Sequence, residues 1–401
     1  MSSFMRRFRL RAASAAALWL AACASRPHVR ATPPPSESQP ARALAPVDDA
    51  LIVPEQPAVL LAPRARVAAG LLNPRGMQPL ASGELLLSEA GNGLPDAAPS
   101  GRLTKLSDRN ADGDYLDDGE QRVLLDRQPS KNILEIVRRD EVFGMAGMAE
   151  GDGRVLVALA FFGGPTTVLQ VIGDTVSEWG KTHTNLNDVT YDPGRKQWYA
   201  VASTTDEIVR LQAGGGVERV VKIPPLENGQ DPVPGYLRHD PVSGEILVTL
   251  FSGSPEGEEG GEGTELVPRA GGIIAVDPDH KSFRWLVRGL TVPTDLEIAA
   301  DGSIYVLQFC RAFLDPVRSH ADLQRGPSHG GFERFSGRLL RIERPSGRTT
   351  VIAEGLDAPT NLVLVGNALL VAEGMGTPGR EIPSPSGSVK LEGFVERIPL
   401  Q

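Results

Sequence analysis

The sequence predicts an all-β fold, a six-bladed β-propeller closed by pairing of its N- and C-terminal strands. Three observations lead to this prediction. A phrase of two short strands around a turn recurs six times, similar third strands follow it, and the two ends of the chain are complementary. Repeats of this kind, at intervals of roughly 40 to 70 residues, are typical of propellers.

The recurring phrase is clearest in residues 289–308, GLTVPTDLEIAADGSIYVLQ. A Gly-Leu pair precedes a proline, and then come an apolar strand, a glycine-containing turn and a second strand. Close copies begin at Gly70 and Gly355, and weaker ones at Met145, Asn187 and Gly235. We label the strands of a blade a to d from the axis outwards, so that each phrase supplies strands a and b.

Strands c alternate apolar and polar residues, as half-buried strands do. They are predicted at residues 101–106, 207–212, 271–276, 337–342 and 393–398. The last of them has no strand d after it, whereas residues 66–71 have the pattern of a strand d with no strand c before it. We therefore expect these two segments to share one blade, which leaves no free sheet edge.

The first 22 residues have the pattern of an export signal. Four arginines precede an apolar run at 12–22 that is too short to span a bilayer. The run ends in Leu-Ala-Ala-Cys, which resembles the bacterial lipoprotein signal. That resemblance implies cleavage before Cys23 and lipidation of its sulfur; the alternative is an ordinary signal peptide followed by a chance cysteine. Ala24 after the cysteine implies the outer membrane, facing the periplasm or the cell surface.

Three segments follow from this pattern: a signal peptide at 1–22, a tether at 23–63 and the propeller at 64–401. The tether is rich in proline and alanine, a composition that favours extended chain, disfavours sheet pairing and would hold the folded body off the membrane. We expect the lipid to be the chain's only contact with the membrane.

Charge and cysteine content narrow the classes of partner. The formal net charge is -9, and loss of the arginine-rich signal makes the chain still more acidic. This balance excludes nucleic acid as an expected partner, because nucleic-acid binding requires a basic face. Apart from Cys23 the chain has only Cys310, so no internal disulfide is expected and Cys310 is predicted to be a buried apolar residue.

Long insertions define a candidate binding face. They occupy residues 90–101, 252–271, 309–337 and 374–391, and all four connect strands b and c. Such loops lie at the same end of every blade, where each strand a begins. Insertions gathered on one face of a repeat fold often form its binding face, although surface loops also tolerate insertions without any function.

Polar residues near the starts of strands a and the ends of strands b are the candidates for an axial site, which could hold a small polar ligand or a cation. The alternative is that they bond neighbouring backbone and join the blades. His183, just before blade 3, is the candidate base if the protein is an enzyme. The candidate ligand-binding residues are Arg75, Asn187, Asp188, Arg238, Asp295, Asn361, Glu89, Gln308 and Glu373.

An Asp-rich loop follows strand c of blade 1. Its sequence, DRNADGDYLDDGE from Asp108, has oxygen side chains at positions 1, 3 and 5 and a glycine at 6, like the front of an EF-hand calcium loop. Position 12 is Gly119 rather than glutamate, so later acidic residues would have to complete the shell. The alternative is a solvated acidic turn. The predicted structural Ca²⁺ ligands are Asp108, Asn110, Asp112, Asp114, Asp117, Asp118 and Glu120.

Several of these segments resemble known propellers: PRGM (74–77), GELLLSEAGNG (83–93), PTDLEIAADGSIYVLQF (293–309) and GRLLRIERPSGRTTVIAEGL (337–356). The chain is similar to the ScyD/ScyE family of secreted six-bladed propellers. More broadly it is similar to NHL-repeat proteins, the SMP-30/gluconolactonase group and the soluble quinoprotein sugar dehydrogenases. The resemblance covers residues 66–398 and implies export.

The sequence therefore predicts an exported lipoprotein that binds a small polar molecule or a partner protein at the insertion-bearing face. The alternative is an enzyme. A dehydrogenase of the quinoprotein type would use pyrroloquinoline quinone, with His183 as base and Arg75 and Arg238 on the cofactor's face. A lactonase would hold a divalent metal with Asp188 and Asp295, although Arg75 stands where that family supplies glutamate.

Overall fold

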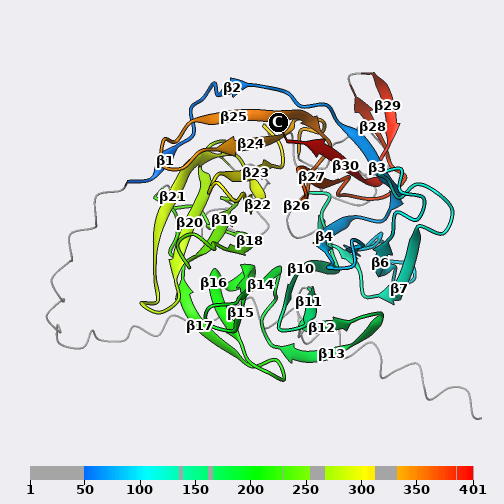
Figure 1. The fold of residues 1–401 in the computed structure, drawn as a ribbon, viewed down its shortest axis with the longest axis horizontal. Coiled ribbons are helices and arrows are strands. Elements are labelled where there is room, and N and C mark those ends of the chain that lie inside the picture. Colours follow the sequence, from blue (N-terminus) through cyan, green and yellow to red (C-terminus); the bar gives the residue numbers. More distant parts are fainter. Residues whose placement is uncertain are drawn as a thin grey trace, which may run out of the picture. The chain divides into compact units, whose positions relative to one another are not determined.

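Six sheets, each built on four antiparallel strands, surround a central channel, and each sheet is one blade of a propeller (Figure 1). The predicted fold class is confirmed. The computed structural model describes residues 49–134, 139–160, 166–227, 229–252, 267–311, 332–384 and 386–400. Within these ranges no helix is both long enough and apolar enough to cross a membrane.

The strands follow the chain from the axis outwards in blades 1 to 5. Blade 1 contains β4 (Pro74–Pro79), β5 (Leu85–Glu89), β6 (Gly101–Leu106) and β7 (Gln121–Gln128); blade 2 contains β10 (Met145–Gly151), β11 (Arg154–Leu159), β12 (Thr166–Ile172) and β13 (Thr175–Thr182). Blade 3 contains β14 (Asp188–Asp192), β15 (Gln197–Ala202), β16 (Glu207–Leu211) and β17 (Val217–Lys222). Blade 4 contains β18 (Pro234–His239), β19 (Ile246–Leu250), β20 (Gly271–Asp277) and β21 (Ser282–Leu290); blade 5 contains β22 (Pro293–Ile298), β23 (Ile304–Gln308), β24 (Gly337–Ile342) and β25 (Thr349–Leu356).

Blade 6 joins the two ends of the chain. Its inner strands are β26 (Asn361–Val365) and β27 (Ala368–Glu373), its third is the C-terminal β30 (Gly393–Pro399), and its outermost is the N-terminal β3 (Ala65–Leu71). β3 pairs antiparallel with β30, with Ala65 opposite Arg397 and Leu71 opposite Gly393. The predicted ring closure is confirmed.

The segment just before β3 is part of two blades. β1 (Leu51–Ile52) adds a parallel fifth strand to β21, and β2 (Ala58–Val59) adds one to β25. The side chain of Val53 is buried in the core between blades 4 and 5. Residues 49–63, which the sequence analysis placed in the tether, thus form a belt around blades 4 and 5. Proline density did not prevent pairing, because the paired residues lie between the prolines.

The recurring Gly-Leu pair has a backbone cause. Gly70, Gly289 and Gly355 have φ values of 70°, 86° and 74°, in the left-handed region that favours glycine. No other atom of the described residues lies within 4 Å of a Cβ placed on Gly70, so conformation rather than space requires glycine at that position. The left-handed residue lets strand d end and turn inwards to the next strand a.

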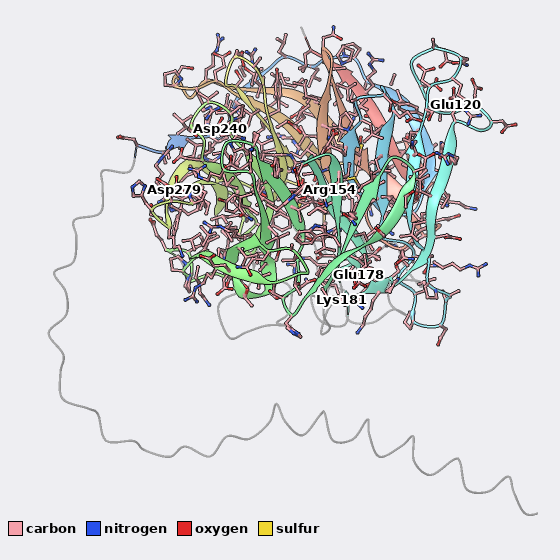
Figure 2. The ribbon with its side chains drawn as sticks, turned by 60° about the horizontal axis from the view of Figure 1, so that its bottom comes forward. Glu120, Arg154, Glu178, Lys181, Asp240 and Asp279 are labelled. Carbon is pink, nitrogen blue, oxygen red and sulfur yellow. The ribbon has the colours of Figure 1, made fainter. Side chains whose placement is uncertain are left out.

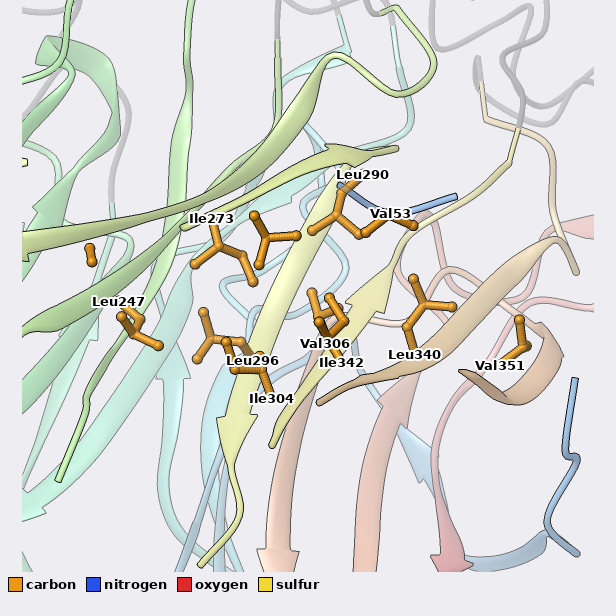
Figure 3. Close-up of a cluster of buried hydrophobic side chains, with 12 residues drawn as sticks. Val53, Leu247, Ile273, Leu290, Leu296, Ile304, Val306, Leu340, Ile342 and Val351 are labelled. Atoms are coloured by element: carbon orange, nitrogen blue, oxygen red, sulfur yellow. The ribbon is translucent and has the colours of Figure 1, made fainter. Parts of the chain in front are cut away.

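Apolar clusters fill the spaces between adjacent blades, and the described ranges contain one for each of the six spaces. Figure 3 shows the cluster between blades 4 and 5, in which Leu247 and Ile273 of one blade face Leu296 and Ile304 of the next. Strands that are buried on both faces need apolar residues at successive positions, and β5, β19 and β23 are buried along their whole length.

The propeller has two distinct faces. The b–c and d–a connections lie on one, the insertion face, and the a–b and c–d turns lie on the other, the turn face. Figure 2 labels Asp240 and Asp279, which are in the a–b and c–d turns of blade 4. The insertion at 374–391 contains a hairpin of β28 (Glu381–Ser384) and β29 (Gly387–Lys390). The connection from β7 to β10 contains the short pair β8 (Lys131–Asn132) and β9 (Val142–Phe143).

Candidate functional site

The inner strands place two layers of side chains around the channel. The six inner strands share one register against their strands b, so equivalent residues can be compared between blades. In each blade the residue that follows the first-layer residue pairs with the middle of strand b. Two residues further along is the second layer, nearer the turn face. The first layer contains Gly76, Gly147, Asp188, Tyr236, Asp295 and Asn361, and the second contains Gln78, Ala149, Thr190, Arg238, Glu297 and Val363.

Three predicted axial residues of the first layer join neighbouring blades. Asp188 accepts a hydrogen bond from the backbone N–H of Leu237 (3.1 Å), and Asp295 accepts one from that of Leu362 (3.0 Å). Asn361 accepts one from the N–H of Met77 (2.8 Å) and donates its own amide to Asp295. All three are fully buried. This arrangement corresponds to the blade-joining alternative of the sequence analysis.

Tyr236 crosses the channel between opposite blades. It lies in blade 4, and its hydroxyl donates to the carbonyl oxygen of Arg75 in blade 1 at 3.1 Å. Burial raises the pKa of Tyr236 to about 12, so the hydroxyl stays protonated and can donate. Tyr236 thereby separates the insertion-face end of the channel from the turn-face end.

A buried ion cluster lies on the turn-face side of Tyr236. The guanidinium of Arg238 contacts Asp295 at 2.8 Å, Asp188 at 3.0 Å and Glu297 at 3.5 Å. Burial raises the pKa of Glu297 to about 7, and it also raises the pKa values of Asp188 and Asp295, while Arg238 opposes the shift. Arg238 was predicted at the start of its strand. It is instead the fifth residue of β18, because a bulge between Pro234 and Leu237 lengthens the strand's beginning.

The predicted residues at the ends of strands b bond to the d–a turns rather than to groups in the channel. Glu89 accepts from the N–H of Leu72, Glu373 accepts from the N–H of Asp357, and the amide of Gln308 donates to the carbonyl of Thr291. Each bond reaches the residue two positions after the glycine of a Gly-Leu pair. The three side chains therefore fasten the d–a turn in blades 1, 5 and 6.

The remaining axial candidates are on the insertion-face side. Asn187 donates its side-chain amide to the carbonyl of Gly235 (2.9 Å), which joins blades 3 and 4. His183 lies in the connection between β13 and β14, on the predicted face, but its side chain is exposed to solvent. Cys23, the predicted lipidation site, lies outside the described residues, as do most of the insertions at 252–271 and 309–337.

Four buried arginines gather at the insertion-face end. The first pair is Arg75, whose Nη1 contacts the sulfur of Met375 at 2.8 Å, and Arg139, which lies over the ring of Phe332. Glu141 faces both of these arginines; burial raises the pKa of its carboxyl, and the two guanidiniums oppose that shift.

The second pair is Arg334 and Arg380. Arg334 Nε donates to Asp357 at 2.6 Å, and Arg380 pairs with Asp140 at 3.2 Å. Burial lowers the pKa of Arg380, Asp140 opposes the shift, and the like charge of Arg334 adds to it. Thr377 and Asn132 also donate to Asp140. We call the four arginines, with Asp140, Glu141 and Asp357, the arginine cluster.

The sequence analysis missed this cluster and the role of Tyr236. Arg139 and Glu141 lie in the d–a connection at 129–144, on the same face. The predicted strands on either side could have marked this connection as a further insertion. Arg334 and Arg380 lie within insertions that were recognised, but nothing local marks them as buried. Their burial comes from the packing of loops from blades 1, 5 and 6, which only the three-dimensional structure shows.

The Asp-rich loop fastens blade 1 to the closing strand. The N–H of Tyr115 donates to the carbonyl of Val67 in β3 (2.7 Å), and the tyrosine ring packs on the core between blades 1 and 6. Its acidic groups accept hydrogen bonds within the loop: Asp108 from Gly113, and Glu120 from Arg109 and Asp117. In the described ranges no three His, Cys, Asp or Glu side chains converge as metal ligands would.

Calcium binding by this loop remains a prediction. If Ca²⁺ replaces the internal hydrogen bonds of the loop, it strengthens the contact with β3, and EGTA should lower the melting temperature by roughly 3 °C or more. Thermal melts with EGTA and with added Ca²⁺ provide the measurement. An Asp112→Asn, Asp114→Asn variant serves as control, because its melting temperature should no longer respond to EGTA. Equal melting temperatures of the unmodified protein in both buffers would contradict a structural calcium site.

The described residues do not fit the catalytic metal of the lactonase alternative. That alternative places a divalent cation between Asp188 and Asp295, but the guanidinium of Arg238 contacts both carboxylates within 3.0 Å. A metal ion would have to displace a buried arginine that already supplies the positive charge. No catalytic step through a metal is derived for this pair.

Comparison with known proteins supports the fold. No family model and no curated protein matches the chain. Among solved structures, a structural genomics protein of unknown function from Bacteroides thetaiotaomicron is 13% identical with a TM-score of 0.50, covering 84% of this chain and 72% of that one.

Two further similar structures have names that state an activity. A protein assigned as an oxidoreductase (glucose dehydrogenase) from Thermus thermophilus is 15% identical, with a TM-score of 0.47 and coverage of 84% of this chain and 99% of that one. Virginiamycin B lyase from Staphylococcus aureus is 10% identical, with a TM-score of 0.42 and coverage of 84% and 89%. At these identities the similarity concerns the propeller fold alone.

Proposed function

We propose that this chain is an exported β-propeller that binds a small anionic ligand at its insertion face, with the arginine cluster as the binding element. The observation that carries the proposal is the burial of four guanidiniums, Arg75, Arg139, Arg334 and Arg380, against three carboxyl groups at the end of the channel. Buried charges normally occur in matched pairs. Guanidiniums gathered around Arg334, whose buried Nη2 has no hydrogen-bond partner among the described residues, are therefore suited to an anion.

Arg334 offers the clearest contact. Its Nε is bonded to Asp357, whereas its Nη2 is buried and has no hydrogen-bond partner among the described residues. Leaving a buried charged donor unpaired is costly, and a planar guanidinium suits a carboxylate or phosphate that can accept two parallel bonds. A ligand with one such group would complete the coordination of Arg334.

Isothermal titration calorimetry of the purified protein tests this proposal. The probes are citrate, glucuronate and inorganic phosphate, with uncharged glucose as the neutral control. At least one anion should bind more tightly than glucose, and Arg334→Gln should weaken it about 10- to 100-fold, which corresponds to the loss of one charge-assisted pair.

A matched control is Arg284→Gln, which removes an exposed arginine that pairs with Glu245 on the outer strand of blade 4. This variant should bind the anion as the unmodified protein does. Equal affinity for the anion in the Arg334→Gln variant, with an unchanged melting temperature, would exclude the arginine cluster as the binding element.

The same purified protein can be used to test the enzyme alternative. Pyrroloquinoline quinone carries carboxylates, so the arginine cluster is chemically suited to it as to other anions. His183 would have to reach the substrate from a solvent-exposed position. Dye reduction with a sugar panel, after addition of the quinone and Ca²⁺, and lactone hydrolysis with Zn²⁺, Mn²⁺ or Ca²⁺ provide the measurements. Activity in either assay would favour an enzyme over a binding protein.

The proposed location is the outer membrane, through a lipid on Cys23. The signal-like first 22 residues and the Leu-Ala-Ala-Cys sequence support it. Membrane fractionation of a Cys23→Ala variant tests the anchor. Retention of that variant in the membrane fraction would contradict it.

A further inference from the structure

A cavity occupies the turn-face end of the channel. Its volume is about 560 Å³, and all six blades contribute to its lining. The six second-layer residues, from Gln78 to Val363, are all among the lining residues. Tyr236 lies between this cavity and the arginine cluster, so the two ends are chemically separate. We call it the turn-face cavity.

The walls of the turn-face cavity combine polar and apolar surface in nearly equal parts. Met77 and Met148 line one side, Val363 and Leu364 line another, and prolines from the first turns of blades 1, 3 and 4 surround the opening. Tyr191 adds an aromatic ring. A pocket of this size and composition fits a small organic molecule with an apolar body.

The charges at the cavity are predominantly negative. Glu297 and Glu150 line it together with Arg238 and His239, and Arg238 contacts Glu297 at 3.5 Å. Arg238 is already shared among Glu297, Asp188 and Asp295, and Asp188 Oδ1 has no hydrogen-bond partner in the described part of the chain. One guanidinium cannot neutralise three buried carboxylates, so a second cation would be favoured beside Glu297.

We infer that the turn-face cavity binds a small primary amine with an apolar body. Its ammonium group would pair with Glu297, which lines the cavity and is partly exposed. Its hydrocarbon part would contact Ala149, Val363 and the prolines of the lining. This site is distinct from the proposed anion site in face, charge and residues.

The test uses hexylamine as the probe, with 1-hexanol and hexanoate as neutral and anionic analogues of the same chain length. Calorimetry on the purified protein should show hexylamine binding at least tenfold more tightly than either analogue. Glu297→Gln removes the charge while keeping the size and should weaken hexylamine about tenfold. Glu178→Gln, on the exposed outer strand of blade 2, is the matched control and should leave binding unchanged.

A second variant keeps the test independent of the charge cluster. Ala149 lines the cavity, so Ala149→Leu should weaken hexylamine by occupying its volume without altering any ion pair. The inference is overturned if hexylamine does not bind, if 1-hexanol binds equally well, or if neither variant weakens the amine. Anion binding by the arginine cluster does not enter any of these outcomes, so the two sites can fail separately.

Discussion

Arg238→Met is expected to lower the free energy of unfolding by more than a surface substitution does. The decrease should be largest at alkaline pH. The substitution keeps a long, unbranched side chain but removes the guanidinium, which leaves Asp188, Asp295 and Glu297 without their shared cation. Removing one partner of a buried ion cluster costs about 3–5 kcal/mol of unfolding free energy. Denaturant melts followed by circular dichroism provide the measurement.

The pH dependence follows from the direction of the pKa shifts. Burial raises the pKa values of the three carboxyl groups above those of the unfolded chain, and that of Glu297 to about 7. A raised carboxyl pKa means stability that is present below about pH 4 and is lost as pH rises through the folded-state pKa. Loss of Arg238 raises these pKa values further. The deficit of the variant should therefore be small at about pH 5 and largest at about pH 8.

Arg284→Met supplies the control for Arg238→Met. Arg284 also pairs with a glutamate, Glu245 at 2.7 Å, but its side chain is half exposed. Exposed pairs contribute about 0–1 kcal/mol, so this variant should melt like the unmodified protein at both pH values. A deficit of Arg238→Met that is equal at the two pH values would show that the three carboxyl groups do not titrate as described.

Gly147→Ala is expected to have the second large effect. A Cβ on Gly147 would lie 1.8 Å from Asp188 Oδ1 and 2.5 Å from its Cγ. The carboxylate cannot move aside cheaply, because its other oxygen is bonded to Arg238 and to the N–H of Leu237. Overpacking and disruption of the ion pair together should cost about 3 kcal/mol or more. Denaturant melts of this variant provide the measurement.

Gly194→Ala is the matched control for Gly147→Ala. A Cβ there would also meet an aspartate oxygen, that of Asp192, but at 3.3 Å. The contact needs only a small adjustment, so the stability should change little. If Gly147→Ala melts as Gly194→Ala does, Asp188 is not held in the position that the ion cluster requires.

The fold was predictable because its determinants are local and repeated. Gly70, Gly289 and Gly355 mark the same left-handed turn in three blades, and alternating strands follow each of them. Even the ring closure could be inferred. The N-terminal end has a strand d without a strand c, the C-terminal end has a strand c without a strand d, and pairing them leaves no free sheet edge. Repetition provides several independent observations of one structural unit.

The site was less predictable because its contacts cross the channel. Tyr236 and Arg75 are 161 positions apart in sequence, and no local pattern connects them. Arg238 was placed at the wrong end of its strand because the bulge in β18 adds residues before the regular pairing begins. Asp188, Asp295 and Asn361 were recognised as axial, but only the structure shows that their oxygens bind the backbone of the next blade.

The belt formed by residues 49–63 has a mechanical consequence. A pulling force applied at its N-terminal end acts first on β1 and then on β2, short pairs of two residues that one or two further backbone hydrogen bonds extend. Both pairs can separate before β3 carries tension, which would release about 15 residues, or roughly 50 Å of extended chain. The propeller itself would stay closed during this extension. Under such a force the belt would therefore detach and lengthen the N-terminal segment before the propeller itself is strained.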